Sequence, residues 1–259
     1  MGKFPSPALR DAKAAAGARP TVLFSHGFGG VRFQSYYLAE HLASHGWIVA
    51  APDHPNNTFA DIDLLSDDAA AAQSAIDRPL DMMFLLDAML ADGAGTGLEV
   101  DPARVAISGH SFGGWTSVEV ARRDPRIAVV VSLAPGFRAP SSPAIAGELG
   151  GRPILLFGGS VDDTTPFTDQ DAAYAAAIAP KLLVRIEGAG HLDFSDLCRV
   201  PFLASAVGDG CDPTSIDPEI VHARTRAVTR AFLGFYLESD ASFGAALEPA
   251  AVTALGNVS

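Results

Sequence analysis

Short apolar runs alternate along the chain with longer stretches in which apolar residues recur at helical spacing. The runs are predominantly apolar instead of alternating with polar residues, which is typical of parallel strands covered on both faces. These predicted strands are 21–25, 47–52, 104–108, 127–133, 153–157 and 181–186. Helical spacing predicts helices at 35–45, 70–92, 112–123, 168–178 and 218–237. The alternation predicts an α/β fold built on a doubly wound, mostly parallel sheet.

The length of the chain and its apolar content predict one large domain. The chain has 259 residues, of which 48% are hydrophobic, and no interior linker divides it. We expect an N-terminal extension over 1–19, the domain itself over 20–240 and a C-terminal tail over 241–259. The segment between the strands at 127–133 and 153–157 is short, so it leaves no room for a large cap domain.

The charge of the chain narrows the classes of partner. A formal net charge of −12 argues against nucleic acid as a partner, because its phosphates require a basic surface.

No apolar run approaches the roughly 18 residues of a membrane span, and the first residues lack the apolar core of a signal peptide. Zinc-binding spacings and phosphate-binding loops are also missing, so we expect no metal and no cofactor. The oligomeric state stays open.

The chain has two cysteines, Cys198 and Cys211, close together in one late loop. Their spacing permits a disulfide but equally two free thiols, because spacing does not define the geometry of the Cβ atoms. A disulfide would favour a secreted or periplasmic protein, whereas free thiols would favour a cytoplasmic one.

A glycine-rich turn interrupts the chain directly after the predicted strand at 104–108. Its sequence, Gly109-His110-Ser111-Phe112-Gly113, matches G-x-S-x-G and leads into the predicted helix at 112–123. Such a strand–turn–helix unit can lift a serine hydroxyl clear of the sheet as a nucleophile, and the glycines relieve the crowding. The alternative is that Ser111 is only a turn former. The context favours a reactive serine.

A serine nucleophile needs a base, and the base needs an acid that orients it. In an α/β fold both are expected after later strands, in the order serine, acid, histidine. Asp162 and Asp163 follow the predicted strand at 153–157, and His191 follows the one at 181–186. Aspartates are also common in turns for structural reasons, and the order alone does not separate these two. We therefore expect His191 as the base and one of the two aspartates as the acid.

The first predicted strand also ends in glycines, within His26-Gly27-Phe28-Gly29-Gly30. This stretch resembles the oxyanion loop of lipases and esterases. The N–H groups of Phe28 and Phe112 are then expected to hold the oxyanion of a tetrahedral intermediate. The alternative is an ordinary strand-to-helix turn.

With these motifs the chain resembles an α/β-hydrolase over about 20 to 240. Within that superfamily it resembles bacterial dienelactone-hydrolase-like esterases, plasma-type platelet-activating-factor acetylhydrolases and cutinase-like polyester hydrolases. The resemblance rests on LFSHGFGG, LASHGWIVAAPDHPNNT, GHSFGG, GGSVDDTTP and GAGHLDFSD. It implies Ser111 as nucleophile, His191 as base and Asp162 as acid, because related hydrolases place the acid four residues before a proline, here Pro166.

Two departures limit what the resemblance implies about the substrate. Dienelactone hydrolases use a cysteine nucleophile, whereas this chain has Ser111. Polyester hydrolases carry a tryptophan where this chain has Gly136 and Phe137, which argues against polymer binding.

The expected activity is that of a cofactor-free serine carboxylic-ester hydrolase whose partner is a small-molecule ester. Esters with small to medium apolar acyl groups are the expected substrates, and lipid-like or polyester-like substrates stay possible. Acyl transfer on the same fold and a non-catalytic binding protein are the alternatives. The loop after His191 is expected to form one wall of the pocket with its apolar residues 200–203. The other expected pocket residues are Phe33, His54, Phe59 and Phe137.

Overall fold

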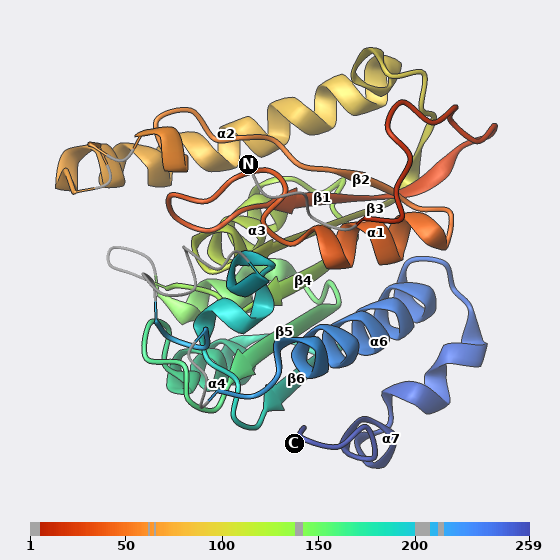
Figure 1. Cartoon of the computed structure of the whole chain (residues 1–259). Coiled ribbons are helices and arrows are strands. Elements are labelled where there is room, and N and C mark those ends of the chain that lie inside the picture. The colour runs from red at the N-terminus through yellow and green to blue at the C-terminus, as the bar shows by residue number, and fades with distance from the viewer. Residues whose placement is uncertain (1–5, 62, 65, 138–141, 200–207, 212–214) are drawn as a thin grey trace.

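A computed structural model describes residues 6–61, 63–64, 66–137, 142–199, 208–211 and 215–259 of the chain (Figure 1). Its centre is a parallel sheet of six strands in the order β2-β1-β3-β4-β5-β6. Because β1 lies inside this order and later strands add on both sides of it, the sheet is doubly wound. The strands are β1 (Arg19–Ser25), β2 (Ile48–Ala50), β3 (Val100–His110), β4 (Val129–Leu133), β5 (Ile154–Gly159) and β6 (Lys181–Ile186).

Helices cover both faces of the sheet (Figure 1). Within β1, Val22 and Phe24 belong to the core cluster formed with α1 and α6, whereas Leu23 belongs to the cluster formed with α2, α3 and α4. Successive residues of a strand point to opposite faces, so continuously apolar strands fill both layers. The helices are α1 (Tyr36–Ser44), α2 (Asp68–Asp92), α3 (Phe112–Arg123), α4 (Phe167–Ala176), α6 (Pro218–Tyr236) and α7 (Pro249–Thr253).

The predicted fold class is confirmed, and each predicted strand and helix is present with boundaries shifted by a few residues. The long helix α2 begins at a side-chain cap, where Asp67 accepts the N–H groups of Ala69 and Ala70. It continues through Pro79 and ends at Gly93, whose left-handed φ of 64° suits a glycine.

The segment expected as a tail, 241–259, packs against the rest of the molecule. It contains the short helix α7, and Val252 and Val258 are buried in the cluster beneath α6. Val258 also forms an antiparallel bridge with Ile186, so the segment lies along the outer edge of β6. Within the described ranges, no helix combines the length and the apolar character that crossing a membrane requires.

Candidate active site

Ser111 lies between the end of β3 and the start of α3 in a conformation that few residues other than glycine adopt. Its φ is 57° and its ψ is −121°. Three backbone hydrogen bonds hold it there: its N–H donates to Leu133 at 2.9 Å, and its carbonyl accepts from Trp115 at 3.1 Å and Gly136 at 3.0 Å. Such strain persists only where the surroundings fix it, and it is concentrated at functional sites.

The glycines on either side of Ser111 are required by close backbone contacts. A Cβ atom at Gly113 would overlap the carbonyl of Ser25 and lie 2.6 Å from the oxygen of His26. A Cβ atom at Gly109 would lie 2.7 Å from the Ser25 oxygen and overlap the backbone of Gly113. The end of β1, the end of β3 and the start of α3 therefore touch through their backbones.

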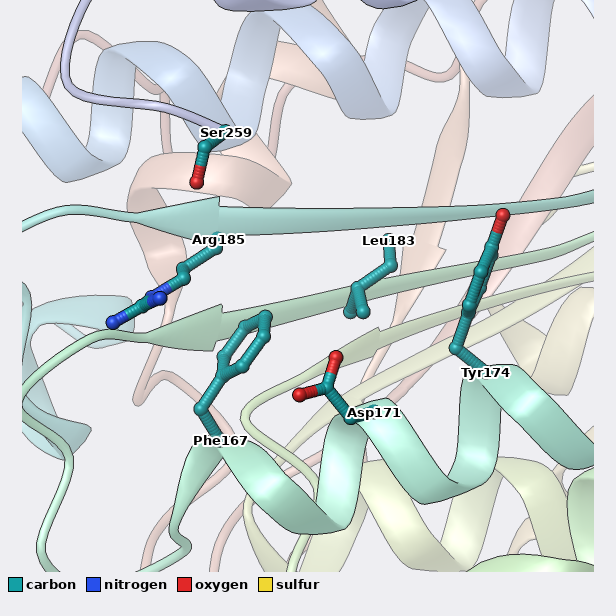
Figure 2. A pocket seen from close by; sticks show the side chains of 6 residues that line it. All are labelled: Phe167, Asp171, Tyr174, Leu183, Arg185 and Ser259. Carbon is teal, nitrogen blue, oxygen red and sulfur yellow. The ribbon is translucent and has the colours of Figure 1, made fainter.

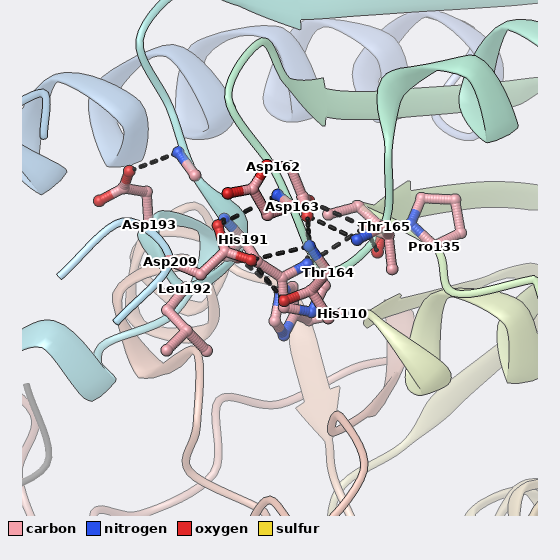
Figure 3. Close-up of polar contacts among 12 residues, drawn as sticks. His110, Pro135, Asp162, Asp163, Thr164, Thr165, His191, Leu192, Asp193 and Asp209 are labelled. Atoms are coloured by element: carbon pink, nitrogen blue, oxygen red, sulfur yellow. Dashed lines mark hydrogen bonds and ion pairs between the residues drawn. The ribbon is translucent and has the colours of Figure 1, made fainter. Parts of the chain in front are cut away.

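The turns after β5 and β6 bring Asp162 and His191 together (Figure 3). The Nδ1 atom of His191 lies 2.9 Å from Oδ2 of Asp162, and both side chains are buried. The other carboxylate oxygen of Asp162 accepts the N–H groups of Thr164 at 3.0 Å and Thr165 at 2.6 Å. Because a carboxylate only accepts, Nδ1 of His191 carries the proton and Nε2 is left as an acceptor. Asp163 is exposed.

Asp209, which sequence reasoning missed, connects these two turns (Figure 3). Its carboxylate accepts the N–H of His191 at 3.0 Å and the N–H of Thr164 at 2.9 Å, as well as the hydroxyl of Thr164. Cys211, two residues further on, forms a disulfide with Cys198, so the pairing that the spacing left open is present. The disulfide closes the loop that carries Asp209.

A second set of contacts joins the turn at Ser111 to the loops on either side of it. Nε2 of His110 donates to the carbonyl of His191 at 2.9 Å, and its Nδ1 accepts from the Gln34 side chain at 2.6 Å. The Gln34 oxygen in turn accepts the N–H of Gly27 at 2.8 Å. Burial, and then the charge of His191, lower the pKa of His110 well below its usual range. His110 is therefore neutral, as one donor and one acceptor nitrogen require.

The aromatic residues predicted around Ser111 occupy different environments. The rings of Phe28 and Phe112 lie 6.0 Å apart, and Phe28 is 42% exposed. Phe33 and Phe59 are also exposed, and the N–H of Phe59 donates to Gly30 at 3.3 Å. Phe137, in contrast, is buried in the core.

The structure places His54 away from the surface. His54 is fully buried beneath the loop after β1, where it contacts Ser25 and Asp81. The apolar residues 200–203 lie outside the described residues. An open hollow elsewhere, between α4 and the edge of the sheet, contains none of the predicted catalytic residues (Figure 2). It is lined by Phe167, Asp171, Tyr174, Leu183, Arg185 and Ser259.

Comparisons with known proteins agree with this architecture. A family model described as chlorophyllase matches residues 2–134. The chain is 26% identical to cutinase est1 of Thermobifida alba over 174 residues, which is 66% of this chain and 52% of the cutinase. It is 23% identical to platelet-activating factor acetylhydrolase of Cavia porcellus over 268 residues, covering 86% of this chain and 59% of that enzyme. The chain thus spans about half the length of the cutinase that it matches.

A solved structure is similar over most of the chain. The ferulic acid esterase from Streptomyces cinnamoneus superposes with a TM-score of 0.67 and is 28% identical in sequence. The match covers 87% of this chain and 69% of the esterase.

Proposed function

The chain belongs to the chlorophyllase family of α/β-hydrolases, and from that premise we propose that it is a serine carboxylic-ester hydrolase. The observation that carries the proposal is the hydrogen bond between Nδ1 of His191 and Oδ2 of Asp162, 2.9 Å apart, beside the strained turn at Ser111. The names of the cutinase and of the ferulic acid esterase support ester chemistry.

In the proposed reaction Ser111 Oγ attacks the ester carbonyl while Nε2 of His191 takes the hydroxyl proton. Asp162 holds the ring in the required tautomer through Nδ1 and stabilises the imidazolium that forms. His191 then gives the proton to the departing alcohol, which leaves an acyl group on Ser111. A water molecule activated by His191 releases the acid and restores the serine hydroxyl.

The tetrahedral intermediates carry a negative charge on the former carbonyl oxygen. We assign the N–H groups of Phe28 and Phe112 as its donors. Phe112 is the first residue of α3, so its N–H has no partner within the helix and the helix dipole favours a negative charge at this end. Loss of one such donor typically lowers kcat by about 10²- to 10³-fold.

Small to medium apolar acyl esters are the proposed substrates. Phe28, Phe33 and Phe59 are exposed on the segments that follow β1 and β2 and contribute apolar surface beside the proposed oxyanion loop. The disulfide of Cys198 and Cys211 supports a secreted or periplasmic location, because disulfides persist in oxidising compartments.

Covalent labelling tests the nucleophile. Incubation with a fluorophosphonate probe, digestion and peptide mass spectrometry should find the label on Ser111, and Ser111→Ala should abolish both labelling and turnover. Ser117→Ala is the matched control, since Ser117 lies on α3 with its hydroxyl bonded to the Gly113 carbonyl. Label on another serine, or turnover in Ser111→Ala, would overturn the mechanism.

A series of p-nitrophenyl esters tests the substrate class. We expect kcat/KM to be greatest for acyl chains of short to medium length. A rate that does not depend on acyl length would contradict an apolar acyl pocket.

A further inference from the structure

An arginine is completely buried beneath the loop that carries Phe28. Arg78 belongs to α2 and is 1% exposed. One terminal nitrogen donates to Ser25 Oγ at 3.0 Å and to the carbonyl of His26, and the other donates to Asn57 at 2.6 Å. The second nitrogen also lies 3.4 Å from the carbonyl of Gly27. The guanidinium of Arg78 thus donates to main-chain and side-chain acceptors at the end of β1, in the loop after it and in the loop after β2.

The same guanidinium also lies over the ring of Phe112, the second residue proposed as an oxyanion donor. Its Cζ atom lies 4.6 Å from the centroid of Phe112. The ring of Phe112 is also stacked on Trp115, with centroids 5.1 Å apart. Arg78 therefore contacts the residues around both proposed oxyanion donors, Phe28 and Phe112.

Among the described residues no acid forms an ion pair with Arg78, and the attraction that opposes the effect of its burial comes from Asp81. The carboxylate of Asp81 accepts from His54 Nδ1 at 2.8 Å, which leaves Nε2 of a neutral His54 as an acceptor. The Ser25 hydroxyl therefore donates to His54 Nε2 at 2.9 Å. Burial, followed by the charge of Arg78, lowers the pKa of His54 to about 2. His54 is therefore neutral. Ser25 is fully buried, so this Ser-His-Asp array has no access to substrate.

These contacts fix the direction of the peptide groups in the loop. In a trans peptide the carbonyl of one residue and the N–H of the next point in opposite directions. The carbonyl of Gly27 faces Arg78, the ring of His26 at 2.7 Å and the N–H of Gly30 at 3.0 Å. The N–H of Phe28 belongs to the same peptide group, so it points away from this cluster.

We propose that Arg78 is a positioning residue for the oxyanion hole, and that its buried positive charge stabilises the anionic tetrahedral intermediate. The proposal rests on the function proposed above. It accounts for an arginine buried without a directly paired acid among the residues that the structure describes. A charge in a poorly solvated interior acts on a nearby developing anion more strongly than one in water.

The test separates binding of the ester from stabilisation of the anion. In Arg78→Met we expect kcat to fall by about 10²-fold or more, with KM nearly unchanged, because the lost interaction is made mainly in the transition state. Inhibition by phenylboronic acid, which forms an anionic tetrahedral adduct with a serine, should weaken by a similar factor. All rates are expressed per active site titrated with the fluorophosphonate, so unfolded protein does not count.

Arg78→Lys provides a readout that a purely structural role would not give. Lysine keeps the positive charge but lacks the planar set of N–H donors of a guanidinium. Burial lowers the pKa of a lysine. Burial lowers the pKa of Arg78 itself to about 9, and lysine starts from a lower pKa than arginine. We therefore expect partial activity at neutral pH and a loss of kcat that begins at a lower pH than in the parent chain, while circular dichroism stays unchanged. The titratable groups facing position 78 are His26, His54 and Asp81; both histidines are already neutral over this range, with pKa values of about 3 and 2.

Arg152→Lys and Arg152→Met are the matched controls. Arg152 is a partly buried arginine that also donates to main-chain carbonyls, those of Leu149 at 2.8 Å and Asp124 at 3.0 Å. Its variants should lose stability but keep kcat per titrated site. If Arg78→Met and Arg78→Lys keep the parental kcat and boronate affinity while Ser111 is still labelled, the role of Arg78 is refuted and the esterase mechanism stands. Failure of the parent chain to be labelled at Ser111 refutes the mechanism itself.

Discussion

Asparagine at position 162 changes one acceptor oxygen into a donor, and the contacts around it determine the outcome. Asp162 accepts from Thr164 N, Thr165 N and the Thr165 hydroxyl, in addition to His191. The two backbone N–H groups both meet Oδ1 and need an acceptor there. The carbonyl of the asparagine must therefore take the Oδ1 position, and its NH₂ group must face His191.

An NH₂ group facing Nδ1 forces His191 into the wrong tautomer. Nδ1 then accepts, the ring proton moves to Nε2, and Nε2 can no longer take the proton of Ser111. We expect kcat to fall by about 10³- to 10⁴-fold, which corresponds to roughly 4 to 5.5 kcal/mol of lost transition-state stabilisation. Because the side chain keeps its size and its two backbone partners, the fold should survive.

Initial rates on p-nitrophenyl butyrate, with the melting temperature of each variant, test this reasoning. The matched control is Asp163→Asn, the same substitution one residue away on an exposed side chain. It should change kcat by less than about twofold, as expected for a surface group away from the reacting atoms. A large loss in Asp163→Asn together with normal turnover in Asp162→Asn would assign the acid to the neighbouring residue.

Two further predictions concern stability. Replacing Cys198 and Cys211 by serine should lower the free energy of unfolding by about 3 kcal/mol in urea titrations, because the disulfide closes a loop with a sequence separation of 13. We also expect kcat to fall, since the loop that carries Asp209 is no longer closed. Equal stability with and without the disulfide would contradict the first expectation. Acidification from pH ~7 to ~5 should also destabilise the protein: histidines with lowered pKa values stay neutral when folded but take up protons when unfolded, so stability is lost as the pH falls below about 6.5. Asp196, whose pKa burial raises to about 6, opposes this with one proton at most, which leaves a net uptake of about four protons on unfolding. Urea titrations that show no pH dependence would refute this reasoning. The histidines concerned are His26, His41, His54 and His222, with pKa values of about 3, 4, 2 and 4, and His110, whose pKa burial holds well below its usual range.

The regular part of the fold could be predicted from sequence because its signals are local. Strands such as β4 are apolar on both faces, and helices such as α6 show one apolar stripe, so period and length are sufficient. The segment 241–259 has no such signal. Its short turns are held by contacts with α6 and β6 that no local pattern specifies.

The order of the proposed catalytic residues along the chain could be predicted from sequence, but the residues that hold them in position could not. Asp209 lies in a loop far along the chain from Thr164, and only the folded backbone brings them together. The position of Arg78 along α2 is a signal in the sequence. Arg78 shares the buried face of α2 with Ser74, Met82 and Leu86 at a spacing of four residues, and a charged residue on such a face needs a buried partner.

The exposed phenylalanines near the proposed oxyanion loop have a consequence for divergence within the family. Phe33 is 60% exposed and Phe59 is 54% exposed, while the backbone beside each is held by other groups, as Asp53 holds the N–H of Arg32 at 2.7 Å. Substitutions at such positions typically change stability by less than about 0.5 kcal/mol. Homologues can therefore exchange the side chains that we propose to contact the substrate without rebuilding the proposed reaction centre beneath them. Selection for a new ester can act on these two positions while Gly109 and Gly113 stay fixed by their contacts.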